Sequence, residues 1–326
     1  MSERTKSLLV VLVPVLIWSV EPLWVKAFLL PEMPAAGIVF YKFLLAGLFL
    51  LPLSRSAWPQ LGRLTGKHWV GVGAIALAGS VMSSYLFTLA LSYTNVGTVM
   101  IFEKMQTLFV IIVGVLLFRY RPPWLLVGLV TAAVLLSGLI VTDGRWNLAL
   151  FQPWWLPIVL LAMPFGFGLV TVLAKVILKL IPPILLTQLR MGLAAPLFFL
   201  LVILPTGVSQ LVVPRPTLWL WLGLSAFASY TLGFGLYYWA LKRISSVLTT
   251  SLELAQPIFA VVGAYFWLHE TFSTLQWAGG GILLIVIFWI TQFEGEAVEL
   301  VPVGEGEGAL LIPADPIEIP PLVGES

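Results

Sequence analysis

Two short polar motifs stand at the same spacing inside long apolar segments of this sequence. Each is a glutamate followed three residues later by a glutamine: Glu103 with Gln106, and Glu253 with Gln256. Residues three apart share one face of a helix, and both glutamates lie roughly 9–12 Å inside their segments at about 1.5 Å per residue. Burial favours the neutral form of a carboxyl group, so Glu103 and Glu253 are candidate proton-coupling groups. Alternatively, the two Glu–Gln pairs are structural and hold helices together by hydrogen bonds. Lys104, directly after Glu103, is a candidate counter-charge.

Basic side chains also fall within the apolar segments. If those segments cross a membrane, Lys26 and Lys42 lie roughly 6–9 Å below one interface, and Lys175 and Arg190 occupy corresponding places near the other. A charge at bilayer depth costs at least ~2.5–3.5 kcal/mol, so it marks a site or an internal pair. One basic pair near each mouth suits a pathway for ligands that carry a carboxylate or phosphate. Snorkelling to the interface is the alternative, most of all for Lys26 and Lys175.

A proline interrupts the first apolar segment directly after Glu21. Pro22 removes a helix hydrogen bond and predicts a kink. Trp18, Pro22 and Lys26 then share one face at spacings of four residues, which suits an aromatic-lined gating segment. A simple packing kink, with Glu21 bonded locally, is an equally good interpretation.

The composition predicts a polytopic membrane protein. Hydrophobic residues make up 60% of the chain and charged residues 10%, whereas soluble domains carry roughly 25% charged residues. Continuous apolar runs of about 20 residues can cross the hydrocarbon core as helices. The expected fold is therefore all-α, with ten transmembrane helices at roughly 7–30, 36–54, 69–92, 95–118, 123–142, 154–177, 183–204, 217–241, 247–268 and 274–293.

The distribution of Lys and Arg predicts the orientation. With a cytoplasmic N-terminus, residues 1–6, ten basic residues fall in inside segments and two in outside loops, so both termini are expected in the cytoplasm. The tail 294–326 holds eight acidic residues and no basic ones, and is expected to be disordered there. A prokaryotic inner (plasma) membrane is the expected location.

The sequence gives no sign of a cofactor or metal centre. It contains no cysteine, and its two histidines, His68 and His269, both lie at expected helix ends. No nucleotide-binding domain is recognisable, so direct use of ATP is not expected. A nucleic-acid partner is not expected either.

A shift of 150 residues lays one half of the chain on the other. The two polar motifs coincide under this shift, as do Trp69 with Trp219, Gly73 with Gly223, Ala90 with Ala240, Leu91 with Leu241 and Phe109 with Phe259. The repeats are expected at 7–142 and 154–293, joined by an outside loop at 143–153. Five spans per repeat is an odd number, so the halves would enter the membrane with opposite polarity, an arrangement that recurs in secondary transporters.

Three stretches carry a resemblance to a known family. "WSVEPLWVK", "LFTLALSYTNVGTV" and "LELAQPIFAVVGAYFWLHETFSTLQWAGGGILLI" resemble the EamA-type branch of the drug/metabolite transporter superfamily over about residues 7–293. The resemblance rests on Pro257, Phe259, Glu270 and Gly279 to Gly281, and it implies two five-helix repeats. The first half departs from the pattern, with Thr107 in place of the proline and "FRYRPP" in place of the terminal glutamate motif.

These observations together favour a secondary-active transporter and not an enzyme. We expect it to export small polar or amphipathic metabolites, amino acids or related carboxylates, by alternating access between the repeats, with proton coupling left open. Trp18, Lys26, Lys42, Gln106, Lys175, Arg190 and Gln256 are the expected pathway or substrate-binding residues. The alternatives are efflux of organic cations and, from another class, an intramembrane lipid-modifying enzyme. The expected partners are the small-molecule substrate and the bilayer, and the protein is expected to be a monomer or homodimer.

Overall fold

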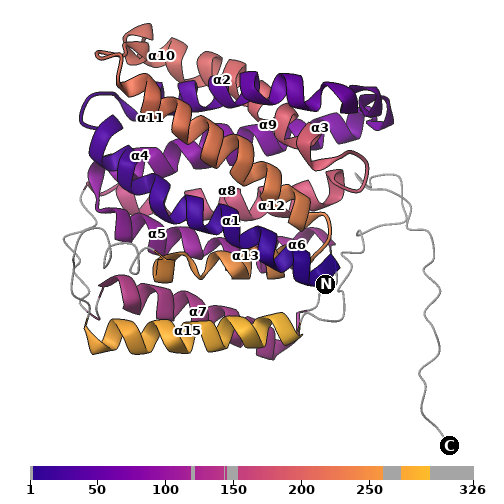
Figure 1. Ribbon diagram of the computed structural model, residues 1–326, viewed down its shortest axis with the longest axis vertical. Helices are drawn as coiled ribbons and strands as arrows, with labels where there is room; N and C mark the ends of the chain where they lie inside the picture. The colour runs from indigo at the N-terminus through magenta and orange to yellow at the C-terminus, as the bar shows by residue number, and fades with distance from the viewer. Residues whose placement is uncertain (1–2, 119–121, 143, 145–152, 260–272, 294–326) are drawn as a thin grey trace, which may run out of the picture.

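Helices make up all the regular structure of the described residues (Figure 1). The computed structural model describes residues 3–118, 122–142, 144, 153–259 and 273–293. The expected acidic tail, most of the loop that joins the halves, and Glu270 lie outside these ranges.

The first half of the chain forms a series of helices with short connections. They are α1 (Glu3–Trp24) with its π-helical continuation η1 (Val25–Leu29), α2 (Ala35–Ser54), the 3₁₀ segment η2 (Arg55–Arg63), α3 (Gly66–Ala74), the π-helical η3 (Ile75–Ser84), α4 (Tyr85–Tyr93), α5 (Val96–Lys104), α6 (Gln106–Phe118) and α7 (Trp124–Thr142).

The second half follows a similar order. Its elements are α8 (Leu156–Ile177), α9 (Pro183–Phe198), the π-helical η5 (Phe199–Ile203), α10 (Leu204–Thr206), the 3₁₀ segment η6 (Val208–Leu211), α11 (Leu218–Ser225), the π-helical η7 (Ala226–Gly233), α12 (Phe234–Leu241), α13 (Ser246–Glu253) and α15 (Thr274–Phe293).

The same capping device starts α5 and α13. The side-chain oxygen of Asn95 accepts the backbone N–H of Thr98 at 2.7 Å, and that of Ser245 accepts the N–H of Leu248 at 3.0 Å. Such N-caps satisfy backbone donors that the first helical turn leaves free. The two caps stand 150 residues apart, which is the shift found in the sequence.

Eight helical segments are long and apolar enough to cross a membrane: Glu3–Leu29, Ala35–Arg63, Gly66–Tyr93, Val96–Leu117, Leu156–Ile177, Pro183–Thr206, Leu218–Leu241 and Thr274–Gln292. The expected fifth span is present as a shorter apolar helix, Trp124–Ile140. The expected ninth span begins with α13, and its part beyond residue 259 lies outside the described residues. The chain is thus a multi-pass membrane protein, with eight of the ten expected spans meeting this length.

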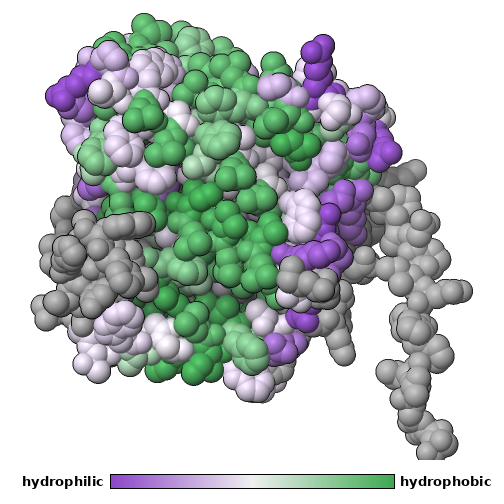
Figure 2. Space-filling view, viewed as in Figure 1, coloured by the Kyte–Doolittle hydropathy of each residue, from purple (hydrophilic) through white to green (hydrophobic). Residues whose placement is uncertain are grey.

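The surface agrees with a membrane environment. Figure 2 shows hydrophobic side chains across the middle of the molecule and hydrophilic ones gathered mainly toward the ends of the helices. Exposed tryptophans near helix ends, such as Trp69, Trp124, Trp154 and Trp277, are placed as an interfacial aromatic belt would be.

Helices from the two halves are interlocked. α2 packs along α9 at one side of the molecule and α7 along α15 at the other (Figure 1). The first helix of each half, however, packs largely within the opposite half. α1 contacts α12, η7 and α13, while α8 contacts η3, α4, α5 and α6. The seam between the halves therefore runs along α1 and α8, where side chains of both halves meet.

Candidate functional site

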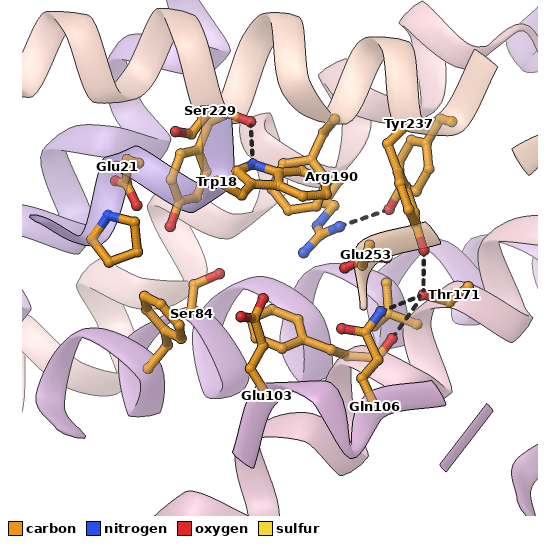
Figure 3. A pocket seen from close by; sticks show the side chains of 17 residues that line it. Trp18, Glu21, Ser84, Glu103, Gln106, Thr171, Arg190, Ser229, Tyr237 and Glu253 are labelled. Carbon is orange, nitrogen blue, oxygen red and sulfur yellow. Dashed lines mark hydrogen bonds between the residues drawn. The ribbon is translucent and has the colours of Figure 1, made fainter. Parts of the chain in front are cut away.

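A cavity lies at this seam. It encloses about 670 Å³ not filled by protein atoms, part of it open to solvent. Its lining comes from α1, η3, α4, α5, α6, α8, α9, η7, α12 and α13: Trp18, Glu21, Pro22, Ser84, Phe87, Glu103, Gln106, Phe167, Val170, Thr171, Arg190, Ser229, Tyr230, Phe234, Tyr237, Tyr238 and Glu253. Figure 3 shows Glu103, Glu253 and the Arg190 guanidinium all directed into the same space.

Five of the expected site residues line the cavity: Trp18, Glu103, Gln106, Arg190 and Glu253. Lys42 reaches it indirectly, through Glu21. Gln256 is fully buried and contacts the cavity wall through Lys104. Lys26 and Lys175 are not among the lining residues.

Two helices are interrupted beside the cavity. α5 ends at Lys104 and α6 begins at Gln106, with the Met105 N–H turning back to the Phe102 carbonyl at 3.0 Å. α13 ends at Glu253, and the N–H of Leu254 turns back to the Ser251 carbonyl at 3.2 Å. These tighter turns leave backbone carbonyls without their usual i+4 donors, so other groups must satisfy them.

The two interruptions have different residues at the equivalent position. In the second half Pro257 has no N–H and its ring crowds the preceding turn. In the first half Thr107 stands at the equivalent position, and its hydroxyl donates across the seam to the Thr250 carbonyl at 3.1 Å. The residue that departs from the family pattern thus bonds one interrupted helix to the other.

A buried polar cluster joins the same two helices. The Lys104 ammonium lies 3.1 Å from the Glu103 carboxylate and donates to the Gln256 side-chain carbonyl at 2.7 Å. The Lys104 side chain is 1% exposed, whereas that of Glu103 is 13% exposed, on the cavity side. Glu103 therefore has a resident counter-charge, as the sequence allowed.

Glu253 is in a different situation. It is buried in the cavity wall, and its Oε1 has no hydrogen-bond partner among the described residues. The Nε2 of Gln256 likewise has none. A buried polar atom without a partner is uncommon, and water or a ligand is the usual explanation.

Glu21 and Lys42 form a buried ion pair at the wall of the cavity. Their charged atoms are 2.5 Å apart, with side-chain exposures of 7% and 2%. The Lys42 ammonium also lies 5.5 Å from the centre of the Tyr230 ring. Glu21 thus bonds to a neighbouring helix and not locally, as one of the two interpretations of the Pro22 region had it, while Trp18 and Pro22 line the cavity.

Arg190 is held by neutral groups. Its Nε donates to the Ser80 hydroxyl at 2.9 Å and its Nη1 to the Tyr238 hydroxyl at 2.8 Å. The guanidinium carbon stands 4.0 Å from the centre of the Phe234 ring, in a cation–π contact. Nη2 has no hydrogen-bond partner among the described residues.

Lys26 and Lys175 hold the ends of other helices. Lys26 Nζ donates to the carbonyl oxygens of Leu91, in the last turn of α4, and Thr94, just after it. Lys175 Nζ donates to those of Leu241, the last residue of α12, at 2.7 Å and of Ile244, after it, at 2.8 Å. A cation there satisfies orphan carbonyls and complements the helix dipole. The two contacts are nearly the same contact made once in each half.

Aromatic side chains complete the wall. The Trp18 ring lies 5.0 Å from Phe234 and 5.5 Å from Tyr237, and its Nε1 donates to the Ser229 carbonyl at 3.3 Å. Thr171 bridges Gln106 and the Tyr237 hydroxyl at 3.4 and 3.2 Å. Sequence reasoning singled out Trp18 here but missed Thr171, Tyr230, Phe234, Tyr237 and Tyr238. The run "FGLYYW" was the available signal, since tyrosine hydroxyls within a span need partners.

Within the described residues, no three His, Cys, Asp or Glu side chains come together as a metal site would need. The arrangement offers instead a charged, aromatic cavity, deep in a helical bundle, walled by both halves of the chain. That is the layout of a membrane transporter, in which a small polar solute binds between two halves.

Comparison with known proteins agrees. The model of the EamA-like transporter family matches residues 5–142 and again residues 154–292, and the chain belongs to this family. The resemblance seen in the sequence is thereby confirmed. A solved crystal structure matches 91% of this chain and 100% of its own, with a TM-score of 0.67 at 15% identity, which shows a shared fold.

Two of the following three curated relatives are transporters by name. The chain is 27% identical to the uncharacterized transporter sll1164 of Synechocystis sp., over 69% of this chain and 66% of that protein. It is 26% identical to the WAT1-related protein At3g02690, chloroplastic, of Arabidopsis thaliana, over 70% of this chain and 56% of that one. An uncharacterized transporter of Methanothermobacter thermautotrophicus is 24% identical, over 80% of this chain and 79% of that protein. The matched region thus spans under two thirds of the first two relatives. The family is one of transporters, not enzymes.

Proposed function

We propose that this protein is a secondary-active transporter that exports small polar or amphipathic metabolites, amino acids or related carboxylates. The observation that carries the proposal is the cavity at the seam, where one nitrogen of a buried guanidinium and one oxygen of a buried carboxyl group have no hydrogen-bond partner among the described residues. Arg190 Nη2 needs an acceptor and Glu253 Oε1 needs a donor. A solute with a carboxylate and an ammonium group would supply both.

Alternating access between two inverted repeats is the mechanism that fits this layout. Its support is the recurrence of the same devices about 150 residues apart: the Asn95 and Ser245 caps, and the Lys26 and Lys175 contacts with helix ends. The packing of α2 on α9 and of α7 on α15 agrees with a pseudo-two-fold axis between the halves. Two equivalent halves around one cavity allow two conformations of similar energy, each open to one side.

Of the two candidate proton-coupling groups, Glu253 is the stronger. Glu103 already has Lys104 at 3.1 Å, so a proton there would compete with a fixed cation. Glu253 has an oxygen without a partner in the cavity wall. A proton and the ammonium group of a solute would therefore compete for Glu253. Competition for one site is the thermodynamic basis of exchange, in which solute leaves as a proton enters.

Flux measurements in proteoliposomes test this proposal. The full chain is reconstituted and offered a panel of amino acids, organic acids and organic cations, each with and without an imposed pH gradient. We expect gradient-driven movement of a carboxylate-bearing class, and loss of the gradient dependence in Glu253→Gln, with a smaller effect in Glu103→Gln. Glu3→Gln is the matched control, because its carboxylate is exposed and far from the cavity.

The outcomes separate the parts of the proposal. If the wild-type protein moves a solute equally fast with and without the pH gradient, proton coupling is contradicted and the protein is a facilitator. No movement of any class across the panel would contradict the transport proposal itself.

Efflux of organic cations is the second candidate function. It is favoured by Glu253 together with the aromatic wall of Trp18 and Tyr237, a combination that suits ammonium ligands. The buried charge of Arg190 opposes it. Amines and their parent amino acids, compared in the same panel, distinguish the two: preference for the amine would replace the first proposal.

We place the protein in the cell inner (plasma) membrane, as a monomer or homodimer, with both termini in the cytoplasm. The Arg4 guanidinium contacts the Thr291 carbonyl, so the start of α1 and the end of α15 lie together. This contact supports placing both ends of the helical bundle on the same side of the membrane. Cysteine substitutions at position 2 and in the tail, probed with a membrane-impermeant thiol reagent on intact cells, test the orientation. Labelling of either end from outside would contradict it.

A further inference from the structure

Each half of the chain places one buried cation at the same position. Lys42 is the eighth residue of α2 and Arg190 the eighth residue of α9, counted from Ala35 and Pro183. Each also contacts the π-helical segment of the opposite half at equivalent places. Lys42 stands over the ring of Tyr230 in η7, and Arg190 bonds to Ser80 in η3, 150 residues earlier.

The two cations differ in what neutralises them. Lys42 has the Glu21 carboxylate at 2.5 Å. The residues that correspond to Glu21 in α8, at shifts of 149 or 150, are Val170 and Thr171, and neither carries a charge. Both line the cavity, where Glu21 also lies. The second half therefore keeps the cation of this pair and lacks its anion.

Among the described residues, Arg190 is accordingly a buried cation with neutral partners only. It is 1% exposed, and its hydrogen bonds go to two hydroxyl groups. Burying a charge without an opposite charge is costly, and the cost is greater inside a membrane. The guanidinium is also closely packed. A Cβ on Gly79 would come 3.0 Å from Nη2 and 2.6 Å from a Val170 methyl group, so only glycine leaves room there.

We propose that Arg190 binds the carboxylate of the transported solute and decides the specificity of the cavity, while Lys42, its counterpart, is structural. The inference rests on the proposed transport function and assigns different roles to the two buried cations. A guanidinium matches the geometry of a carboxylate with two parallel donors, and Nη2 is the donor that has no partner. The solute supplies the negative charge that Glu21 supplies in the other half.

Thermal unfolding of the purified full chain in detergent tests this without a gradient and without knowledge of the solute. The probes are sodium acetate, 2-methylpropanoate and benzoate, each against its neutral amide at equal concentration and with chloride as the ionic-strength control. We expect at least one carboxylate to raise the unfolding temperature of the wild-type protein in a concentration-dependent way, and its amide to have no effect.

Two variants locate the effect. In Arg190→Gln the stabilisation by carboxylate should vanish, measured against the ligand-free unfolding temperature of the same variant. In Arg190→Lys the apparent affinity should fall about tenfold, because an ammonium cannot bind a carboxylate with two parallel donors. The lysine variant keeps the test valid if Arg190→Gln does not fold.

The inference is overturned if no carboxylate in the series stabilises the wild-type protein, or if Arg190→Gln responds as wild type does. It fails separately from the transport proposal. If carboxylate stabilises the wild-type protein but no flux is seen in proteoliposomes, the proposed anion site stands and the transport proposal fails. Conversely, if Arg190→Gln carries a carboxylate-bearing solute as fast as wild type does, the transport proposal stands and the proposed role of Arg190 fails.

Discussion

Replacement of Lys42 by methionine should be among the most destabilising single substitutions in this chain. The change removes the charge and keeps a similar apolar stem, so its main effect is to leave Glu21 without its partner. The Glu21 side chain is only 7% exposed, and water cannot readily take over the missing interaction. Breaking a buried ion pair from one side costs about 3–5 kcal/mol, and we expect Lys42→Met to lower the free energy of unfolding by that amount.

The double variant Glu21→Gln with Lys42→Met gives the sharper measurement. It removes both charges together, so most of the loss should return, because replacing a whole buried pair is often close to neutral. Lys6→Met is the control. Lys6 and Glu3 are 2.6 Å apart, almost the same distance, but their side chains are 45% and 63% exposed, and we expect no resolvable change there.

Reversible unfolding in mixed micelles, with increasing dodecyl sulfate, supplies the four free energies of the cycle. The reasoning fails if Lys42→Met costs less than about 1 kcal/mol, the range typical of an exposed pair. It also fails if the double variant loses as much as the sum of the two single variants, because the two charges would then not stabilise each other.

Three further substitutions test other parts of the bundle by the same unfolding assay. Gly166→Ala places a Cβ 2.9 Å from a backbone carbonyl oxygen of η3 and should cost about 1–3 kcal/mol by overpacking. Gly73→Ala is the control and should be tolerated, because a Cβ there meets no described atom within 4 Å. Equal losses of stability in the two variants would contradict close packing of α8. Thr107→Val removes the hydroxyl that donates to the Thr250 carbonyl and should cost about 1–3 kcal/mol, whereas Thr107→Ser should retain most of the stability. Lys175→Met frees two helix-end carbonyls and should cost about 1.5–3 kcal/mol; wild-type stability would show that water replaces the lysine.

The all-helical membrane fold was accessible from the sequence because the membrane limits the choices. Long apolar runs must be helices, and the breakers between them set their ends, so eight of the ten expected spans correspond to helical segments of spanning length among the described residues. The candidate site was accessible in part. Glu103, Gln106 and Glu253 stood out as polar groups at depth within apolar segments, and all three line the cavity.

What the sequence did not give are the partners of the charges. Depth alone cannot tell a cation that lines a cavity from one that holds a helix end, as Lys26 and Lys175 do. The pairing of Glu21 with Lys42 depends on how two helices pack, which the local pattern does not contain. Aromatic residues such as Tyr237 look alike in a sequence whether they face lipid or a cavity. In each case a tertiary contact decides the role.

The interlocking of the halves has a consequence for how the protein is made. α1 bonds to η7 and α11 through Trp18 with Ser229 and Trp24 with Ser225, which are 211 and 201 residues apart. At roughly 5–20 residues per second, these partners leave the ribosome about 10–40 s after α1. Lys42 follows Glu21 by only 21 residues, within a few seconds. The nascent first hairpin can therefore neutralise its own charge in the bilayer while α1 waits, shielded by lipid alone, for the second half of the chain.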